Sequence, residues 1–182
     1  MSWHDSCKAE LPCSIAVSDG ETVVIAQHIP VAHAGLEGDP FQIETGARYA
    51  AAGFVCAMPF IFHWWPKEAS IEVKRKEFRD DNTVADLKAT VDRLSSLDNC
   101  DAARIGIVGH CWGGRVAWLG ACHDERYRAC GLFYGGRIKL PFSDGAPPPI
   151  EMANDIKAPV IGFFGNDDQN PTPEDVDDYS KA

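Results

Sequence analysis

The chain has 182 residues, of which 45% are hydrophobic, and it carries a formal net charge of -10 with a pI near 4.9. This length predicts a single domain spanning residues 1–182, large enough to bury a substantial core. The acidic balance argues against nucleic acid and anionic membrane surfaces as partners, since both bind positive patches, and no apolar run approaches the roughly 20 residues of a membrane span.

Apolar runs alternate with helical patterns along the chain. Strands are expected at residues 22–26, 54–58, 105–108, 130–134 and 160–164, and helices at 41–52, 84–97 and 114–122 and from Pro173 onward. Residues 143–149 are expected to form a loop rich in proline and glycine. Continuously apolar strands that alternate with helices predict an α/β fold, with a mainly parallel sheet covered by helices on both faces.

In such a sheet the ligand site lies beyond the carboxyl ends of the strands. Four segments are therefore expected to converge there: residues 27–29, the aromatic loop around Trp64, the turn at Cys111, and residues 166–168. Trp64 and its neighbour Trp65 either line an apolar substrate pocket at this edge or pack in the core.

The turn at Cys111 carries the most informative chemical signal in the sequence. Residues 109–113 read Gly-His-Cys-Trp-Gly, between an apolar strand and an expected helix. A strand, a sharp turn with a nucleophile at its tip and a helix make up a nucleophile elbow, in which glycines let strand and helix pass closely. A helix N-terminus favours thiolate over thiol, so Cys111 is expected to have a lowered pKa and to be alkylated faster than the other cysteines. The alternative is a buried structural cysteine. His110, beside it, is expected to point away into packing.

The remaining cysteines give no sign of a disulfide framework. The seven lie at positions 7, 13, 56, 100, 111, 122 and 130, without Cys-x-x-Cys pairs. Scattered thiols of this kind suit a reducing compartment better than disulfides or a zinc site. The first five residues lack the basic start and apolar centre of a signal peptide. The sequence therefore predicts a cytoplasmic protein without a metal site.

With these segments in place, the chain resembles the dienelactone hydrolase family of α/β-hydrolases over most of residues 22–182. The matching segments are 23–27, 48–55, 105–114, 132–135 and 159–168. The resemblance implies a three-layer α/β-hydrolase fold. It also implies a hydrolase of small lactones or activated esters that uses a Cys-Asp-His triad and no cofactor.

Carried over by position, the resemblance assigns four residues to the site. Cys111 is the nucleophile and Asp168 the triad acid, and the backbone N–H groups of Ile29 and Trp112 form the oxyanion hole. The family often has a glutamate next to the resting cysteine where this chain has His28. His28 is therefore a possible partner of the thiol, and Trp64 a possible pocket residue.

The chain departs from the family at its triad histidine. The order in this fold is nucleophile, acid, histidine, and no histidine lies between Asp168 and Ala182. The family's final strand and helix are also expected to be missing, which predicts weak or no activity of the chain alone and an exposed apolar sheet edge. The alternative function is a non-catalytic or redox-responsive binding protein of the same fold. Substrate identity and oligomeric state are left open.

Overall fold

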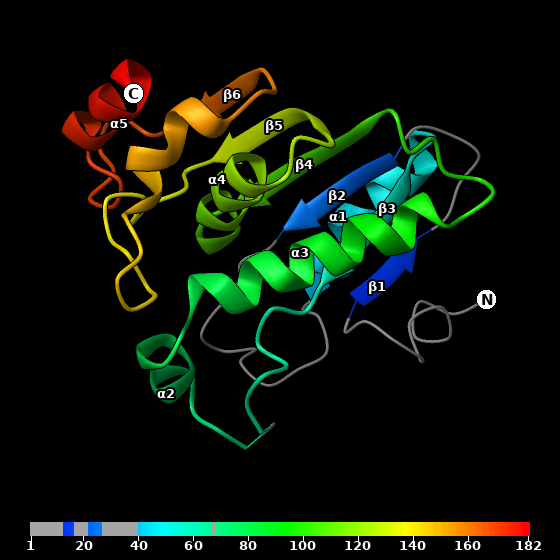
Figure 1. Cartoon of the computed structure of the whole chain (residues 1–182), viewed down its shortest axis with the longest axis horizontal. Helices are drawn as coiled ribbons and strands as arrows, with labels where there is room; N and C mark the ends of the chain where they lie inside the picture. Colours follow the sequence, from blue (N-terminus) through cyan, green and yellow to red (C-terminus); the bar gives the residue numbers. More distant parts are fainter. Residues whose placement is uncertain (1–12, 17–21, 27–39, 67) are drawn as a thin grey trace.

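A computed structural model describes residues 13–16, 22–26, 40–66 and 68–182. Within them the strands form one sheet in the order β1-β3-β2-β4-β5-β6 (Figure 1). The strands are β1 (Cys13–Ala16), β2 (Thr22–Ala26), β3 (Val55–Pro59), β4 (Ile105–His110), β5 (Tyr127–Phe133) and β6 (Val160–Phe163). Only β1 runs antiparallel to its neighbour in this sheet, so the prediction of a mainly parallel sheet is confirmed.

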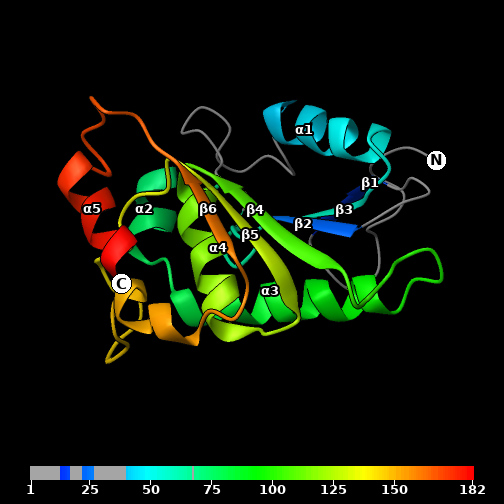
Figure 2. The ribbon, with the colours of Figure 1, turned by 90° about the horizontal axis from the view of Figure 1, so that it is seen from above.

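Helices cover both faces of the sheet. One face carries α1 (Pro40–Ala51), and the other carries α3 (Asp80–Ser95) and α4 (Trp112–His123), as Figure 2 shows. This three-layer α/β arrangement confirms the predicted fold class. Three further elements are shorter: α2 (Ile71–Lys76), the 3-10 helix η2 (Pro149–Asp155) and α5 (Pro173–Lys181). No described helix is long and apolar enough to cross a membrane.

Some element boundaries differ from the sequence-based expectation. The helix expected at 84–97 is α3, which begins earlier, at Asp80, and ends at Ser95. Its first turn was missed because it has no apolar stripe, although Asp80 is buried by pairing with Arg115. The strand β1 was missed because it has only four residues, and α2 was missed because its charged sequence shows no apolar stripe. The 3-10 helix η2 begins at the end of the expected loop 143–149.

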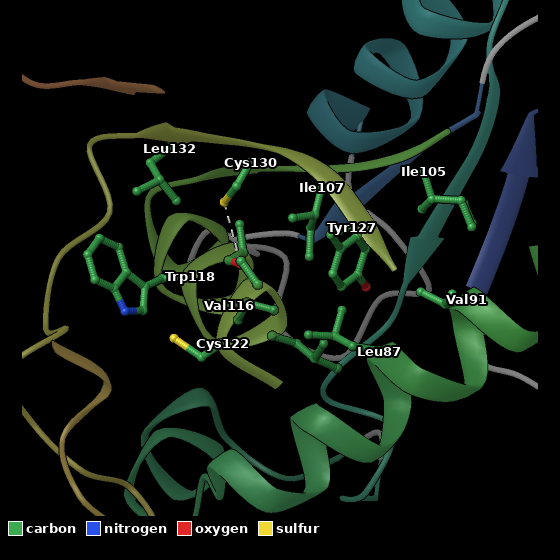
Figure 3. Packing of buried hydrophobic residues seen from close by; sticks show 14 of the residues in the cluster. Leu87, Val91, Ile105, Ile107, Val116, Trp118, Cys122, Tyr127, Cys130 and Leu132 are labelled. Atoms are coloured by element: carbon green, nitrogen blue, oxygen red, sulfur yellow. Dashed lines mark hydrogen bonds between the residues drawn. The ribbon is translucent and has the colours of Figure 1, made fainter. Parts of the chain in front are cut away.

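The core lies between the sheet and the α3–α4 layer (Figure 3). Leu87, Val91 and Leu94 of α3 share one face of that helix, and each is at most 1% exposed. They pack with Ile105 and Ile107 of β4 and with the apolar face of α4. The central strand β4 is therefore fixed by its two neighbouring strands and by the helices packed on it. Its carboxyl end is a rigid position for a reactive side chain.

Strand β6 is the last strand of the described sheet and pairs only with β5. Its apolar side chains are unusually exposed: Val160 by 41%, Ile161 by 58% and Phe163 by 49%. The exposed apolar side chains of β6 agree with the expectation of an exposed apolar sheet edge. The predictions of one domain and of missing final elements remain predictions.

Candidate active site

The turn between β4 and α4 holds Cys111 in a strained backbone conformation. Cys111 has φ 54° and ψ -117°, outside the region that non-glycine residues normally adopt. Its N–H donates to the carbonyl oxygen of Phe133 at 2.9 Å, and its own carbonyl accepts from the N–H of Gly114 at 2.9 Å. The strand–turn–helix geometry predicted for this segment is therefore present, with Cys111 at the carboxyl edge of the sheet.

Two glycines make the turn possible. A Cβ on Gly109 would lie 1.8 Å from the carbonyl oxygen of Gly113, and a Cβ on Gly114 would lie 2.6 Å from the Cα of Gly135. Both clashes are with backbone, which no side-chain rotation can relieve. The small residues around Cys111 are thus required by the close passage of β4, α4 and the end of β5.

Burial controls the charge of Cys111. Loss of hydration raises the pKa of its half-buried thiol, although the Trp112 N–H and the charge of Arg75 act to lower it; the charge of Asp168 raises it further. The expectation of a lowered pKa is therefore wrong. The loss of hydration raises the pKa of the thiol by more than the helix N-terminus and the charge of Arg75 lower it. Cys111 rests mainly as a thiol, so a base must take its proton before it can attack.

Ionisation of three other described cysteines is suppressed more strongly than that of Cys111. Burial raises the pKa of Cys56, Cys122 and Cys130 to about 12 each. The Sγ of Cys130 also donates weakly to the carbonyl oxygen of Ala117 at 3.7 Å. Cys111 is consequently expected to be alkylated before these three. Cys100 is half-exposed like Cys111, and it is the thiol against which Cys111 must be compared.

Asp168 lies in the loop between β6 and α5, at the same edge of the sheet. It is close enough to Cys111 for its charge to raise the pKa of the thiol. One of its carboxylate oxygens accepts from the N–H of Asn170 at 3.0 Å, which fixes the loop locally. No hydrogen bond between Asp168 and Cys111 is found in the described part of the chain. The structure brings these two predicted residues into one region without joining them directly.

Trp112, the first residue of α4, has both a backbone and a packing role. Its backbone N–H acts on the Cys111 sulfur. Its indole ring stacks on Phe142, with ring centroids 5.4 Å apart, and meets the edge of Phe78 at 5.1 Å. These aromatic contacts fix the start of α4, and with it the Trp112 N–H that acts on the sulfur.

Trp64 is anchored to α3. Its indole N–H donates to Asp86 Oδ2 at 2.9 Å, and Nε2 of the adjacent His63 lies 2.9 Å from Asp86 Oδ1. Trp64 is 48% exposed, so it remains able to line a pocket, and that role stays a prediction. His28 and Ile29 lie outside the described residues.

His110 packs as expected. Its ring stacks on Phe133, with centroids 4.5 Å apart, and burial lowers its pKa. Phe133 in turn stacks on Phe163 at 4.8 Å, so these three rings form a row across β4, β5 and β6.

Sequence reasoning missed two residues of this site. Tyr134 follows β5 with φ 43°, and the charge of Cys111 helps to raise its pKa. Arg75 projects from α2 within electrostatic range of the Cys111 sulfur. The position of Tyr134 at the carboxyl end of a predicted strand could have identified it. Nothing in the local sequence connects Arg75 with a residue 36 positions away.

Arg75→Met is expected to slow the alkylation of Cys111 by iodoacetamide. Loss of the positive charge raises the thiol pKa further, so less thiolate is present near neutral pH, and the rate there should fall roughly two- to fivefold. At a pH above both pKa values the two rates should converge. Lys76→Met, an exposed change on the same helix, is the control. Identical pH–rate profiles for Arg75→Met and the unmodified protein would show that this charge does not act on the sulfur.

The described residues contain no group of three or more His, Cys, Asp or Glu side chains that could hold a metal ion. The described residues near Cys111 offer backbone N–H groups, a carboxylate, a phenol and a guanidinium beside the thiol.

Comparison with known proteins relates this arrangement to one family. A model of the dienelactone hydrolase family matches residues 15–182. A Methylorubrum extorquens protein that carries the provisional name carboxymethylenebutenolidase is 38% identical over 104 residues, which cover 57% of this chain and 35% of that protein. A carboxymethylenebutenolidase of Pseudomonas sp. is 30% identical over 168 residues, covering 85% of this chain and 63% of that protein. The chain thus spans less than two thirds of these relatives.

Solved structures agree on the fold. A Klebsiella pneumoniae structure provisionally named a dienelactone hydrolase superposes with a TM-score of 0.70 at 24% identity, over 93% of this chain and 72% of that one. The match of the family model to residues 15–182 shows that this chain belongs to the dienelactone hydrolase family.

Proposed function

We propose that this protein hydrolyses small esters or lactones through a thioester formed on Cys111. The observation that carries the proposal is the strained turn at φ 54°, which places a half-buried sulfur at the start of α4 and at the carboxyl edge of a central strand. Positive φ at a non-glycine residue is energetically unfavourable, and such strain is concentrated at functional sites. Family membership supports the same reaction class, since a relative carries the name carboxymethylenebutenolidase.

In the proposed reaction the Cys111 thiolate attacks the carbonyl carbon of the substrate. The Trp112 N–H, together with that of Ile29, stabilises the negative charge on the carbonyl oxygen, an effect of roughly 3–4 kcal/mol for a well-placed donor. Because burial raises the pKa of the thiol, a base is needed to remove its proton. Asp168 would orient a histidine for that task, either His28 or an imidazole supplied from outside this sequence.

A redox-responsive or binding role is the second candidate. It is favoured by a half-buried thiol to which no carboxylate or imidazole of the described residues is hydrogen-bonded. A protein of this kind would use the same accessible sulfur for reversible oxidation or would only hold a small molecule near it.

Acetyl transfer to Cys111 distinguishes the two. The protein is incubated with p-nitrophenyl acetate and quenched, and the acetylated peptide is identified by mass spectrometry. We expect an acetyl thioester on Cys111, formed together with p-nitrophenolate, and its loss in Cys111→Ala. Cys100→Ala, which removes the other half-exposed thiol of the described residues, should behave like the unmodified protein.

Equal acetylation of Cys100 and Cys111 would contradict a specific nucleophile. If Cys111 is not acetylated but hydrogen peroxide oxidises it before the other thiols, the redox role replaces the hydrolase.

A further inference from the structure

Two consecutive glycines follow β5 and lie against two different parts of the candidate site. A Cβ on Gly135 would lie 2.8 Å from the Cα and the carbonyl carbon of Gly114, in the first turn of α4. A Cβ on Gly136 would lie 2.6 Å from the side-chain oxygen of Asn170, in the loop that carries Asp168. This segment therefore contacts the nucleophile turn with one residue and the acid loop with the next.

The contact on the side of Cys111 is made by backbone alone. The N–H of Gly114 donates to the Cys111 carbonyl oxygen at 2.9 Å, and the N–H of Cys111 donates to the carbonyl oxygen of Phe133 at 2.9 Å. An added Cβ on Gly135 would also lie 3.0 Å from the backbone nitrogen of Arg115. Backbone atoms at the start of a packed helix cannot rotate away, so Gly135 is held at a fixed distance from the nucleophile turn.

The contact on the side of Asp168 passes through Asn170. The backbone N–H of Asn170 donates to Asp168 Oδ1 at 3.0 Å, which couples the positions of these two residues. The carbonyl oxygen of Asn170 would lie 2.9 Å from a Cβ on Gly136, so rotation of the Asn170 side chain alone does not make room for a methyl group. Among the described residues Asp168 Oδ2 accepts no hydrogen bond. That oxygen is the one left for the N–H of a triad imidazole.

The ends of the strands bring the two contacts into one region. The N–H of Tyr134, which directly precedes the two glycines, donates to the carbonyl oxygen of Phe163 at the end of β6 at 2.8 Å. Asp168 lies in the loop that follows β6, and its charge raises the pKa of the Cys111 thiol. Nucleophile and acid are therefore neighbours at one edge of the sheet, connected through residues 135–136 rather than by a bond of their own.

We propose that Gly135 and Gly136 form a spacer that sets the distance between the Asp168 carboxylate and the Cys111 sulfur, an inference that rests on the proposed Cys111 hydrolase function. In a triad the acid reaches its nucleophile only through the imidazole between them, so this distance decides whether the imidazole can bond to both. Gly135 fixes the spacer to α4, and Gly136 lets Asn170, and with it the acid, approach closely. Gly136 is a positioning residue, since it acts on the reaction through Asp168.

Gly136→Ala is expected to move the acid away from the sulfur. Asn170 is exposed, so its loop can shift without unfolding the core, which circular dichroism checks. The negative charge of Asp168 then raises the pKa of the thiol by less, and more thiolate is present near neutral pH. Alkylation of Cys111 by iodoacetamide should accelerate there roughly twofold. At a pH above the thiol pKa of both proteins the two rates should converge.

Three further variants identify the cause of that change. Asp168→Asn should accelerate the alkylation about two- to fivefold, and adding Gly136→Ala to it should have no further effect, because the charge is already gone. Asn170→Ala in the Gly136→Ala protein removes the side-chain contacts at 2.6 and 2.9 Å and should return the rate most of the way to that of the unmodified protein. Gly165→Ala is the matched control: it adds the same methyl group to the acid loop, where its Cβ would meet the Asp168 Cβ at an ordinary 3.8 Å. Its rate should not change.

The outcomes separate the spacer from the hydrolase function. Arg75 and Tyr134 also interact electrostatically with the Cys111 sulfur, and both are unchanged in these variants, so a shifted pH–rate profile reports the acid. A profile that Gly136→Ala leaves unshifted, whatever Asp168→Asn does, would overturn the spacer. The same acceleration by Gly136→Ala with the Asp168 charge removed would also contradict it. Failure of the unmodified protein to form an acetyl thioester on Cys111 with p-nitrophenyl acetate would overturn the hydrolase function, while the spacing measured by alkylation would stand.

Discussion

Replacing Gly109 with alanine is expected to destabilise the protein by about 3 kcal/mol or more. The added Cβ would lie 1.8 Å from the carbonyl oxygen of Gly113 and 2.2 Å from its carbonyl carbon. Both atoms belong to the first turn of α4, so relief requires the helix to move away from β4. That movement would open the core between α4 and the sheet, and clashes of this severity are among the largest single-residue effects on stability.

The loss is measured by urea unfolding followed by circular dichroism. Gly106→Ala is the matched control, because it makes the same change on the same strand, and its Cβ would meet the Ala129 carbonyl oxygen at an ordinary 3.5 Å. That variant should unfold within about 1 kcal/mol of the unmodified protein. If the two variants unfold at the same urea concentration, the close passage of strand and helix at Gly109 does not constrain the fold.

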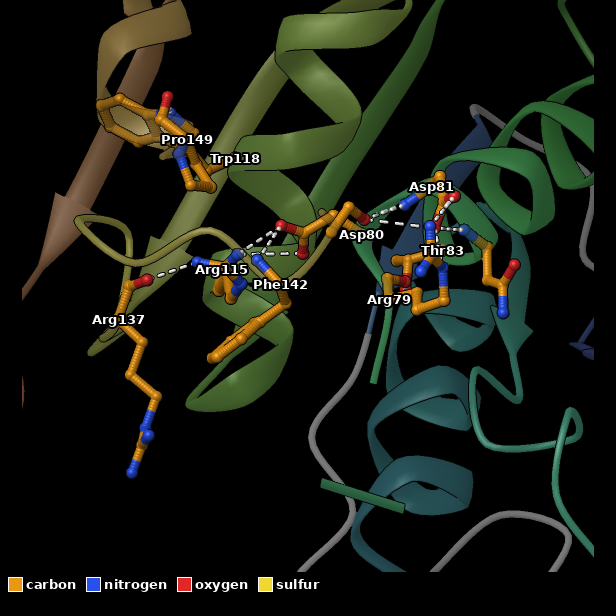
Figure 4. A network of polar contacts seen from close by, with 11 residues as sticks. Arg79, Asp80, Asp81, Thr83, Arg115, Trp118, Arg137, Phe142 and Pro149 are labelled. Atoms are coloured by element: carbon orange, nitrogen blue, oxygen red, sulfur yellow. Dashed lines mark hydrogen bonds and ion pairs between the residues drawn. The ribbon is translucent and has the colours of Figure 1, made fainter. Parts of the chain in front are cut away.

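Arg115→Met is expected to destabilise the protein by about 3–5 kcal/mol, because it leaves a buried carboxylate without its charged partner. Arg115 is fully buried, and its Nη2 donates to both carboxylate oxygens of Asp80 at 2.9 and 2.7 Å (Figure 4). Its Nη1 donates to the Arg137 carbonyl oxygen, and its guanidinium lies 4.2 Å from the centre of the Phe142 ring. This side chain joins α4 to α3 and to the segment that holds Phe142 against Trp112.

A double variant separates the ion pair from the packing. Asp80→Asn with Arg115→Met should lose less stability than the sum of the two single changes, since neither charge then remains buried alone. Arg104→Met is the surface comparison: its pair with Asp101 at 2.7 Å is exposed, and its loss should change stability by less than about 1 kcal/mol. A loss for Arg115→Met no larger than that of Arg104→Met would mean that packing alone holds this part of the core.

What the sequence could predict about the site depended on how local each signal is. The turn at Cys111 was predictable because its glycines, apolar strand and following helix lie within a short stretch of chain. The pKa of Cys111 was predicted in the wrong direction, since a sequence shows the helix N-terminus beside the sulfur but not how much water the fold removes from it.

Tyr134 and Arg75 belong to the opposite case. Each comes near the sulfur through tertiary packing: Tyr134 through the register of β4 with β5, and Arg75 through α2, a short helix whose charged sequence gives no apolar pattern. The early start of α3 was hidden for a related reason, because Asp80 looks like a surface residue until Arg115 is placed beside it.

The two proposed catalytic side chains, Cys111 and Asp168, follow strands of different local stability, β4 and β6. Cys111 ends a strand with a neighbour on either side and a helix layer above it, so displacing it requires disruption of the core. Asp168 follows β6, which within the described sheet is hydrogen-bonded to β5 alone and exposes Ile161 and Phe163 to solvent. Such a strand can detach in a small opening that leaves the rest of the sheet folded. The distance between acid and nucleophile therefore depends on an edge strand of the described sheet, and any contact that buries β6 would bring the acid into a fixed position without touching the sulfur.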